Sequence, residues 1–378
     1  MEIKNYFSKM FYIYFFLMFI GKRFGTSETE QYTYILIVSV IFFLLKFCLD
    51  KFSLKEIVIL TGALGYGIIS VIFNGKVALL FTIITLCGMK NIELRKIYQT
   101  MLIAEIFLFL YNLCRYFISD KSQYVIFTER ANFGKTIESM RCSLGFVHPN
   151  SMHLNYFILV TLIVLLFVKF RTILGYSLLF LLNIYLYWIG GSRTGAILVT
   201  LFLFLSYLLS FEITKKIIIR MKYYFSFFPI LFSTLTIWIV YNYSNYLWIK
   251  QLDQSLQHRI QFSNIFLKQH AIRLFGNRFD FDGKVIIDSG YVELLLKVGF
   301  LAFILFCIVH FLVIQKLISS HMHYELVVLL VSLIYCCIEP FDINIFMNYS
   351  LIYISLIIFN NDINVVSNFK YMIKNEKI

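Results

Sequence analysis

The sequence predicts an all-α, polytopic integral membrane protein with about 12 transmembrane helices. Of its 378 residues, 60% are hydrophobic and only 15% are charged, whereas soluble domains are about 45–50% apolar and about 25% charged. Because a membrane-spanning helix needs roughly 20 apolar residues, the apolar residues suffice for about eleven or twelve helices. Almost nothing remains for a soluble domain, so we expect a single transmembrane domain over residues 1–378.

Apolar runs bounded by charged residues place the predicted helices. We treat the first run as an uncleaved span, because Gly21, Lys22 and Arg23 follow it where small cleavage-site residues would stand. Pro149 suits the first turn of the sixth helix, where its missing N–H costs no hydrogen bond. The predicted spans lie near residues 6–21, 32–49, 57–73, 77–89, 98–114, 150–168, 172–189, 194–211, 223–241, 290–314, 325–339 and 346–360.

The distribution of Lys and Arg predicts the orientation. No basic arm or zinc-ligand spacing accompanies the net charge of +13, so a nucleic-acid partner is not expected and membrane topology explains the charge better. With the N-terminus inside, the short outer loops carry only Lys22, Arg23, Lys76 and Arg193, and the inner segments carry most of the other cations outside the long loops. Cytoplasmic loops are enriched in Lys and Arg, so both termini are predicted to be cytoplasmic.

Two long loops, residues 115–149 and 242–289, fall on the predicted extracytoplasmic face. They are rich in Arg and Lys beyond what orientation requires, which indicates an anionic ligand. In the second loop Leu252, Leu256 and Ile260 recur every four residues among polar ones, the pattern of an amphipathic helix on the membrane surface. The alternative is a solvated loop helix without a ligand.

The first candidate cluster is the segment from Arg141 to Asn150, which leads into the sixth predicted span. It combines a guanidinium group, the imidazole of His148 and a helix N-terminus. The planar fork of Arg fits phosphate oxygens, and the free N–H groups at a helix start favour an anion. A lipid diphosphate is therefore a plausible ligand, with helix capping and interface anchoring as the alternative.

The second cluster is Gly-Gly-Ser-Arg-Thr-Gly at residues 190–195, which opens the eighth predicted span. A cation in the first turn of a helix opposes the helix dipole, which indicates that Arg193 is retained for a partner. The glycines beside Ser192 would let a phosphate approach the backbone closely. The alternative is that Arg193 reaches lipid headgroups.

The third cluster begins at Arg259 and ends with Asp288 and Tyr291 at the start of the tenth predicted span. If the outer helix ends converge, Asp288 lies near the other arginines. Its carboxylate then either accepts the proton of an attacking hydroxyl or caps the helix. Glu339 and Asp342 form a further outer acidic pair with the same ambiguity.

The sequence contains only a weak match to a metal-binding motif. Asp280-Phe281-Asp282 has the DxD pattern of nucleotide-sugar transferases. Nucleotide sugars are cytoplasmic, however, and this loop is predicted to lie outside. We therefore expect neither a metal nor a cofactor.

The three clusters together resemble motifs of Wzy-type oligosaccharide repeat-unit polymerases, in the superfamily that includes O-antigen ligases, and look most like the capsule polymerases of low-GC Gram-positive bacteria. The matching stretches run in order from about 120 to 299. They are Arg-Cys-Ser-Leu-Gly-Phe-Val-His-Pro-Asn (141–150), Gly-Ser-Arg-Thr-Gly (191–195), the stretch 259–276, and Ile-Asp-Ser-Gly-Tyr followed by Gly299.

This resemblance implies a GT-C-like glycosyltransferase of the bacterial cytoplasmic membrane, active on its outer face. It would transfer a growing glycan from undecaprenyl diphosphate to the non-reducing end of an undecaprenyl-diphosphate-linked repeat unit. We hypothesise that Arg141, Arg193 and Arg259 bind the diphosphate, that Asp288 or His148 is the catalytic base, and that Asn150, Ser192 and Tyr291 support them. The resemblance also implies a flippase and a chain-length regulator as partners.

Two other classes of function fit parts of the sequence. A ligase that transfers the finished glycan to another acceptor would use the same arginines. A lipid-linked oligosaccharide flippase has a similar number of spans, but its cations are expected in a central cavity at membrane depth rather than at helix ends. A secondary transporter would show interrupted helices in corresponding halves, and the glycines of the third span have no clear counterpart near residue 250.

Overall fold

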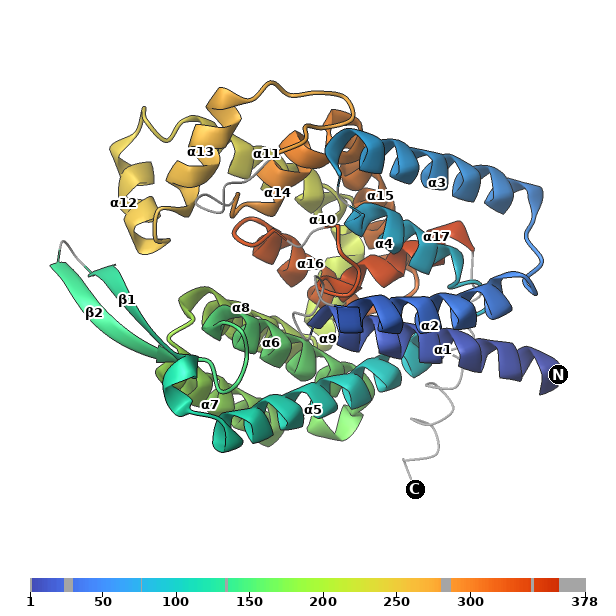
Figure 1. Ribbon diagram of the computed structural model, residues 1–378, viewed down its shortest axis with the longest axis horizontal. Helices are drawn as coiled ribbons and strands as arrows, with labels where there is room; N and C mark the ends of the chain where they lie inside the picture. The colour runs from blue at the N-terminus through green and yellow to red at the C-terminus, as the bar shows by residue number, and fades with distance from the viewer. Residues whose placement is uncertain are drawn as a thin grey trace.

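Among the residues that the computed structural model describes, the regular structure is helical apart from one two-stranded hairpin (Figure 1). The structure describes residues 2–23, 30–75, 77–132, 135–279, 287–340 and 343–359, with their side chains except those of 2–7, 30, 31, 128–132 and 135–138. The predictions for Asp280, Asp282 and Asp342 therefore lie outside the described residues. The side chains of Arg130 and Lys135, two cations of the first long loop, are not described either.

The first part of the chain forms five helices. α1 packs along α2 and α5, and α3 packs on α4. Ser53 caps α3 in a reciprocal pairing with Glu56, in which each side chain bonds the other's backbone N–H. The bounds are α1 (Glu2–Arg23), α2 (Glu30–Phe47), α3 (Leu54–Asn74), α4 (Ala78–Cys87) and α5 (Leu94–Ile118).

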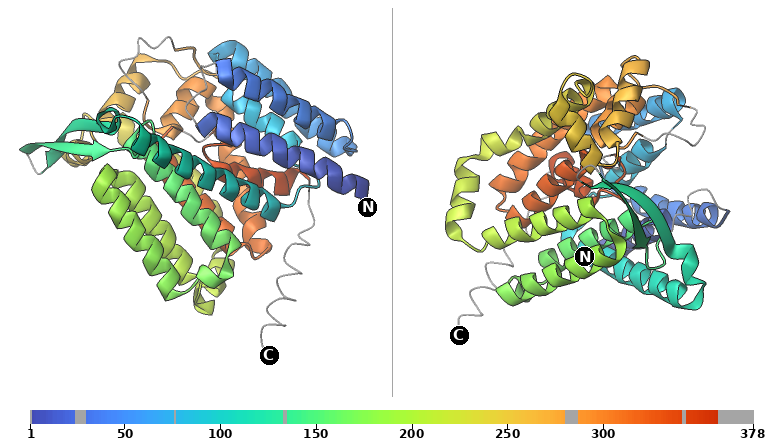
Figure 2. Two further views of the ribbon diagram at one scale, coloured as in Figure 1. Left: turned by 60° about the horizontal axis from the view of Figure 1, so that its bottom comes forward. Right: turned by 90° about the vertical axis from the view of Figure 1, so that its left-hand side faces the viewer.

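The first predicted loop is largely a β-hairpin, which the sequence did not predict. A short 3₁₀ turn, η1 (Lys121–Tyr124), leads into β1 (Val125–Asn132), which pairs antiparallel with β2 (Lys135–Cys142) so that Val125 lies opposite Cys142. The hairpin projects beyond the helices at one end of the molecule (Figure 2).

The helices that follow the hairpin pack against one another and against earlier and later helices. α6 packs against α5, α7 and α8, and α8 also packs against α16. Their bounds are α6 (Pro149–Leu166), η2 (Val168–Phe170), α7 (Ile173–Gly190), α8 (Arg193–Leu208), α9 (Glu212–Arg220), α10 (Lys222–Ser226) and α11 (Phe228–Tyr241).

The second predicted loop folds into a small helical cap with its own apolar core. Val240, Ile249, Ile260 and Phe266 are buried together with Ile287, Val292 and Leu296. The cap consists of α12 (Leu247–Ser255) and α13 (Arg259–Gln269), which lie at the same end as the hairpin (Figure 1). The single surface helix predicted from Leu252, Leu256 and Ile260 is wrong, because the chain turns between α12 and α13.

The tenth predicted span is broken near its start. α14 (Gly290–Glu293) continues into a π-helical turn, η3 (Leu294–Val298), and ends at Gly299, whose φ is 113°. A Cβ at Gly299 would lie 2.4 Å from the carbonyl oxygen of Leu274. The close approach of the backbone at Leu274 therefore explains the break in the helix. The chain then forms α15 (Phe300–Ser319), α16 (His323–Cys336), the 3₁₀ turn η4 (Tyr349–Ile354) and α17 (Ser355–Ile358).

The helices are those of a multi-pass membrane protein, although fewer than twelve of the described helices are long enough to cross a bilayer. Five described helices are long and apolar enough to cross: α3, α5, α6, α7 and α15. The pair α8 and α9, which is bent by 100°, is a sixth if the two helices form one span. Every predicted segment overlaps a described helix, but several of these helices are short. With 10 residues in α4 and 14 in α16, at 1.5 Å per residue they reach only about 15–21 Å through a hydrocarbon core of about 30 Å.

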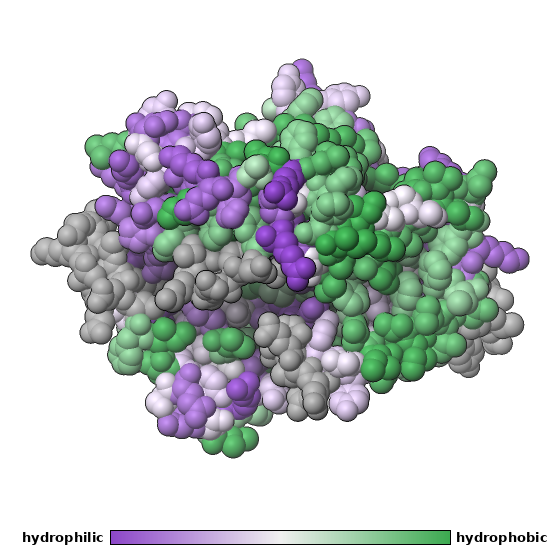
Figure 3. All heavy atoms as spheres, turned by 45° about the horizontal axis from the view of Figure 1, so that its top comes forward, coloured by the Kyte–Doolittle hydropathy of each residue, from purple (hydrophilic) through white to green (hydrophobic). Residues whose placement is uncertain are grey.

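The surface is apolar over long stretches, as expected for lipid contact. Ile37, Ile41, Val58 and Ile72 on α2 and α3 are all more than half exposed. Hydrophobic residues cover much of the face shown in Figure 3. The core itself lies between the helices and includes large side chains of α1, α5, α6 and α16.

Contacts between helix ends follow the predicted alternation of sides. Lys90 donates to the carbonyl oxygen of Lys51 and pairs with Glu56, and Lys222 donates to Ser319 Oγ at 2.7 Å. All five residues are predicted to lie on the cytoplasmic side. The three predicted arginines meet at a different set of helix ends.

Candidate functional site

The three predicted arginines converge on one small pocket. Arg141 lies near the end of β2, Arg193 begins α8 and Arg259 begins α13. Residues from distant parts of the sequence therefore line the same pocket. The volume of about 30 Å³ is far below the roughly 300–1,000 Å³ of pockets that enclose a whole ligand, so this pocket has room for only a small part of one. It is lined by Arg141, Asn150, Gly191, Arg193, Thr194, Ser255, Leu256, Gln257 and Arg259.

A continuous chain of polar contacts joins the walls of this pocket. Arg141 is buried and donates from Nε to the carbonyl oxygen of Gly190 at 2.9 Å and from Nη2 to Asn150 Oδ1 at 2.8 Å. Asn150 Nδ2 donates to Glu339 Oε1 at 3.4 Å, and Arg259 Nη1 donates to the same oxygen at 2.7 Å. Glu339 therefore ties α13 to the start of α6.

Arg193 differs from the other two arginines. Among the residues that the structure describes, its guanidinium group has no hydrogen-bond or ion-pair partner, and its side chain is half-buried at the pocket. Arg259, in contrast, is neutralised by Glu339. Arg193 is thus a cation at the pocket whose charge no described residue neutralises.

His148 is the N-cap of α6 rather than an obvious proton acceptor. Its Nδ1 accepts from the backbone N–H of Asn150 at 3.1 Å. Burial, reinforced by the charges of Arg141 and Arg259, lowers its pKa to about 4, so the imidazole is neutral at pH 7. A neutral imidazole that accepts at Nδ1 carries its proton on Nε2, which leaves no nitrogen free to accept another.

The depressed pKa of His148 predicts acid sensitivity. Between pH 6.5 and 4 the unfolded chain binds a proton at this residue that the folded chain does not, so the stability that neutral His148 contributes is complete above pH 6.5 and is lost as the pH falls towards 4. His148→Asn keeps an N-cap oxygen but does not titrate. In thermal unfolding of the detergent-solubilised protein, we expect the Tm of this variant to fall less than the Tm of the wild type when the pH is lowered from 7 to 4.5. Parallel pH profiles of the two proteins would contradict the assignment.

Asp288 interacts with Arg259 but neither lines the pocket nor caps a helix. Its carboxyl group is half-buried, accepts no hydrogen bond from the described residues, and interacts electrostatically with Arg259 and Glu339. Burial raises its pKa, and the charge of Arg259 opposes that shift. The N-cap of α14 is Ser289, so the capping alternative for Asp288 is not observed. A carboxylate held near a cation with free lone pairs is suited to accept a proton.

The glycines of the second cluster serve chain packing more than ligand approach. A Cβ at Gly190 would lie 2.5 Å from Met152 Cε, and one at Gly195 would lie 2.5 Å from His153 Cβ. Both glycines therefore let α7 and α8 pack closely on α6. Gly191 has a φ of 57° and ends α7, and of the three only this glycine lines the pocket.

Two predicted supporting residues do not line the pocket. Ser192 is buried at the N-cap of α8 and makes no capping hydrogen bond through its side chain. Tyr291 is buried, and its hydroxyl donates to the carbonyl oxygen of Leu333 at 2.7 Å. Tyr291 thus attaches α14 to α16, and its contribution to the site is positional.

Sequence reasoning missed the turn between α12 and α13. Gln257 and His258 have φ values of 60° and 65°, a left-handed conformation that is uncommon in residues other than glycine. Ser255 and Gln257 reach the pocket through this turn. Neither Gln257 nor His258 is a glycine that would mark such a turn, so no clear sequence signal was present.

Asp253 holds this turn in place. Its buried side chain accepts from the backbone N–H of Ile260 at 2.7 Å and of Gln261 at 3.4 Å, which caps α13 from the preceding helix. Asp253→Ala leaves these N–H groups without their acceptor and should destabilise the cap by about 1–3 kcal/mol. Limited proteolysis should then cut faster between α12 and α13.

The matched control for this change is Lys250→Ala on the same helix. Lys250 is exposed, so its replacement should leave the rate of cleavage at the turn unchanged. Equal cleavage rates for Asp253→Ala and Lys250→Ala would show that Asp253 does not hold the turn.

The described residues contain no group of three or more His, Cys, Asp and Glu side chains placed to hold a metal ion. No known protein family, curated protein or solved structure matches the chain. Its function is therefore inferred from the chemistry of the pocket and from the motifs that form it.

Proposed function

We propose that the protein polymerises undecaprenyl-diphosphate-linked oligosaccharide repeat units in the synthesis of a capsular or other surface polysaccharide. It transfers the growing glycan from its lipid diphosphate to the non-reducing end of a new repeat unit. The observation that carries this proposal is the convergence of Arg141, Arg193 and Arg259 on one pocket. These residues come from three separate motifs, all of which resemble motifs of Wzy-type polymerases.

The charge of the pocket fits a diphosphate. Arg259 is partly neutralised by Glu339 and is held in place by it, and Arg141 is anchored to Gly190 and Asn150. Arg193 then supplies a guanidinium fork to the incoming phosphate oxygens. Cations on the leaving diphosphate stabilise the negative charge that develops as the glycosidic bond breaks.

The proposed reaction is a direct displacement at the anomeric carbon. The acceptor hydroxyl oxygen forms the new bond to that carbon, the bond from carbon to the diphosphate oxygen breaks, and undecaprenyl diphosphate leaves with the electron pair. Asp288 accepts the hydroxyl proton, and the configuration inverts. We favour Asp288 over His148 as the base, because the ring nitrogen of His148 that accepts a hydrogen bond is already occupied.

We further propose that the chain crosses the bacterial cytoplasmic membrane about twelve times in a GT-C-like arrangement, with both termini cytoplasmic and the arginine pocket outside. The alternating positions of the helix ends and the distribution of Lys and Arg support this topology. Short helices such as α4 and α16 then cross with the help of the segments that follow them. A flippase and a chain-length regulator are the expected partners.

The proposal is tested by deleting the gene in its host and restoring it as wild type, Arg141→Ala, Arg193→Ala or Asp288→Asn. Membrane insertion is checked by immunoblotting, and the surface glycan is resolved by size. Polymerase function predicts single repeat units in the deletion strain and no restoration by inserted variants. Unattached lipid-linked polymer would instead identify a ligase, and repeat units trapped on the inner leaflet would identify a flippase.

A further inference from the structure

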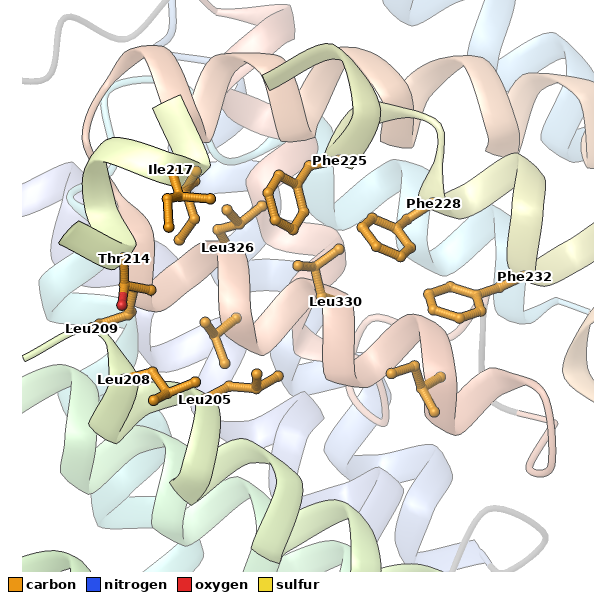
Figure 4. Close-up of a pocket in the computed structure, with 13 residues that line it drawn as sticks. Leu205, Leu208, Leu209, Thr214, Ile217, Phe225, Phe228, Phe232, Leu326 and Leu330 are labelled. Atoms are coloured by element: carbon orange, nitrogen blue, oxygen red, sulfur yellow. The ribbon is translucent and has the colours of Figure 1, made fainter. Parts of the chain in front are cut away.

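An apolar cavity of about 240 Å³ lies between α8, α9, α11 and α16. Leucine and phenylalanine side chains such as Leu205, Phe228 and Leu330 point into it from these separate helices (Figure 4). Thr214 is its one lining residue with a polar side-chain atom among the described residues. The cavity therefore suits a hydrocarbon ligand.

The cavity is far from the arginine pocket. α8 begins at Arg193, which lines the arginine pocket, and ends at Leu208, which lines the cavity. With 16 residues in α8 and 1.5 Å per residue, this helix is about 24 Å long. The cavity thus lies towards the predicted cytoplasmic ends of the helices.

α9 forms one wall of the cavity and has the features of an interfacial helix. It is bent by 100° from α8, so it lies across the direction of that helix. Ile217 and Ile218 line the cavity, and Lys216 and Arg220 lie beside Ile217, about 100° and about 60° around the helix by the helical periodicity. An apolar face directed inwards with cations along its edge is typical of a helix at the surface of an anionic membrane.

The charge around the cavity is strongly positive. The cations of α9 and the start of α10 are Lys215, Lys216, Arg220 and Lys222, and the acidic residue of α9, Glu212, pairs with Lys215 at 2.6 Å. Clusters of Lys and Arg beside a bilayer attract anionic lipid headgroups. The other three cations form no ion pair with a described residue.

The size of the cavity also indicates an occupant. The cavity is partly open to the outside of the molecule, so a chain can enter it, and an apolar cavity of roughly 150 Å³ already takes up benzene. The larger cavity here accommodates a segment of an acyl chain. Because α9 carries both the apolar wall and the cations, one lipid satisfies both.

We propose that this cavity binds one anionic membrane phospholipid, with an acyl chain between α8 and α16 and its phosphate held by Lys216 and Arg220. The inference is independent of the proposed polymerase function, since it uses neither the arginine pocket nor its motifs. It assigns α9 a role in attaching the predicted cytoplasmic end of the helices to the lipid leaflet.

The test measures binding of palmitoyl-oleoyl phosphatidylglycerol to the purified full-length protein by native mass spectrometry and by the Tm in detergent, with the phosphatidylcholine of the same acyl chains as the reference lipid. We expect one phosphatidylglycerol to be retained and to raise the Tm more than phosphatidylcholine does. The double variant Lys216→Gln, Arg220→Gln should bind phosphatidylglycerol roughly tenfold to thirtyfold more weakly. Lys51→Gln, Lys55→Gln, which removes two exposed cations of the same predicted side, should not.

The cavity itself is tested by filling it. Leu330→Trp should abolish retention of phosphatidylglycerol, and Leu205→Phe serves the same purpose if the first variant does not fold. Unchanged lipid binding in a folded, cavity-filled variant would overturn the proposal, as would equal stabilisation by the two lipids. An equal Tm shift with inorganic phosphate alone would also overturn it, because the site would then recognise an anion without a chain.

Discussion

Replacing Arg193 with alanine should lower kcat/KM for transfer of a lipid-linked repeat unit by roughly 10- to 150-fold while leaving the fold intact. A hydrogen bond to a charged group contributes about 1.5–3 kcal/mol, and about 1.4 kcal/mol corresponds to a factor of ten. Stability should change little, because no described residue pairs with the guanidinium group of Arg193. The measurement is polymerisation in proteoliposomes together with the Tm.

Two further variants separate charge from geometry. Arg193→Lys keeps the positive charge but loses the bidentate fork, so it should restore only part of the activity. Arg273→Ala removes an exposed arginine of the same predicted face that does not line the pocket, and its activity should match the wild type. If Arg193→Ala polymerises normally, or if Arg273→Ala fails equally, the arginine pocket is not the diphosphate site.

Replacing Gly145 with alanine should be the most destabilising single change near the site. Gly145 has a φ of 87°, and a Cβ there would lie 1.9 Å from the backbone carbonyl oxygen of Asn112 in α5. The left-handed conformation costs about 1–2 kcal/mol in other residues, and forced overpacking adds about 1–3 kcal/mol. We expect a loss of about 2–5 kcal/mol, measured as a lower Tm, and loss of polymer because the segment from Arg141 to His148 must move.

Gly65 provides a matched control in the same protein. It lies within α3, and a Cβ added there has no atom within 4 Å. Alanine is favoured over glycine inside helices by about 1 kcal/mol, so Gly65→Ala should keep or raise the Tm. A Gly145→Ala protein as stable as this control would show that the loop between β2 and α6 has another conformation.

Composition and hydropathy were sufficient to predict the class of protein and the approximate positions of its apolar helices, but not their lengths. Apolar composition does not depend on tertiary contacts, because lipid replaces water as the solvent of the exposed side chains. Each predicted apolar segment therefore overlaps a helix of the structure. The three motifs also fell at helix starts or at turns, where Pro149 and Gly191 mark the ends of regular structure.

The lengths of the helices and the positions of their breaks depend on tertiary contacts. Hydropathy does not register a break such as that at Gly299, which arises because the backbone at Leu274 approaches from a distant segment. The hairpin β1–β2 was missed because neither Val-Ile-Phe-Thr-Glu-Arg-Ala-Asn nor Lys-Thr-Ile-Glu-Ser-Met-Arg-Cys has a sustained alternation of apolar and polar residues. The helical cap formed by α12 and α13 was missed for a related reason, since its turn has left-handed residues that are not glycines.

Helix packing also sets which candidate residues meet. The separations of these residues along the chain do not indicate that Glu339 contacts both Asn150 and Arg259. Nor do they indicate that Arg193 alone of the three arginines has no described partner. Such contacts depend on which helix ends lie together, and side-chain packing along the whole helices fixes that arrangement. Residue types and spacing predict the chemistry that a segment offers, whereas the fold determines which charges are already neutralised and which remain for a ligand.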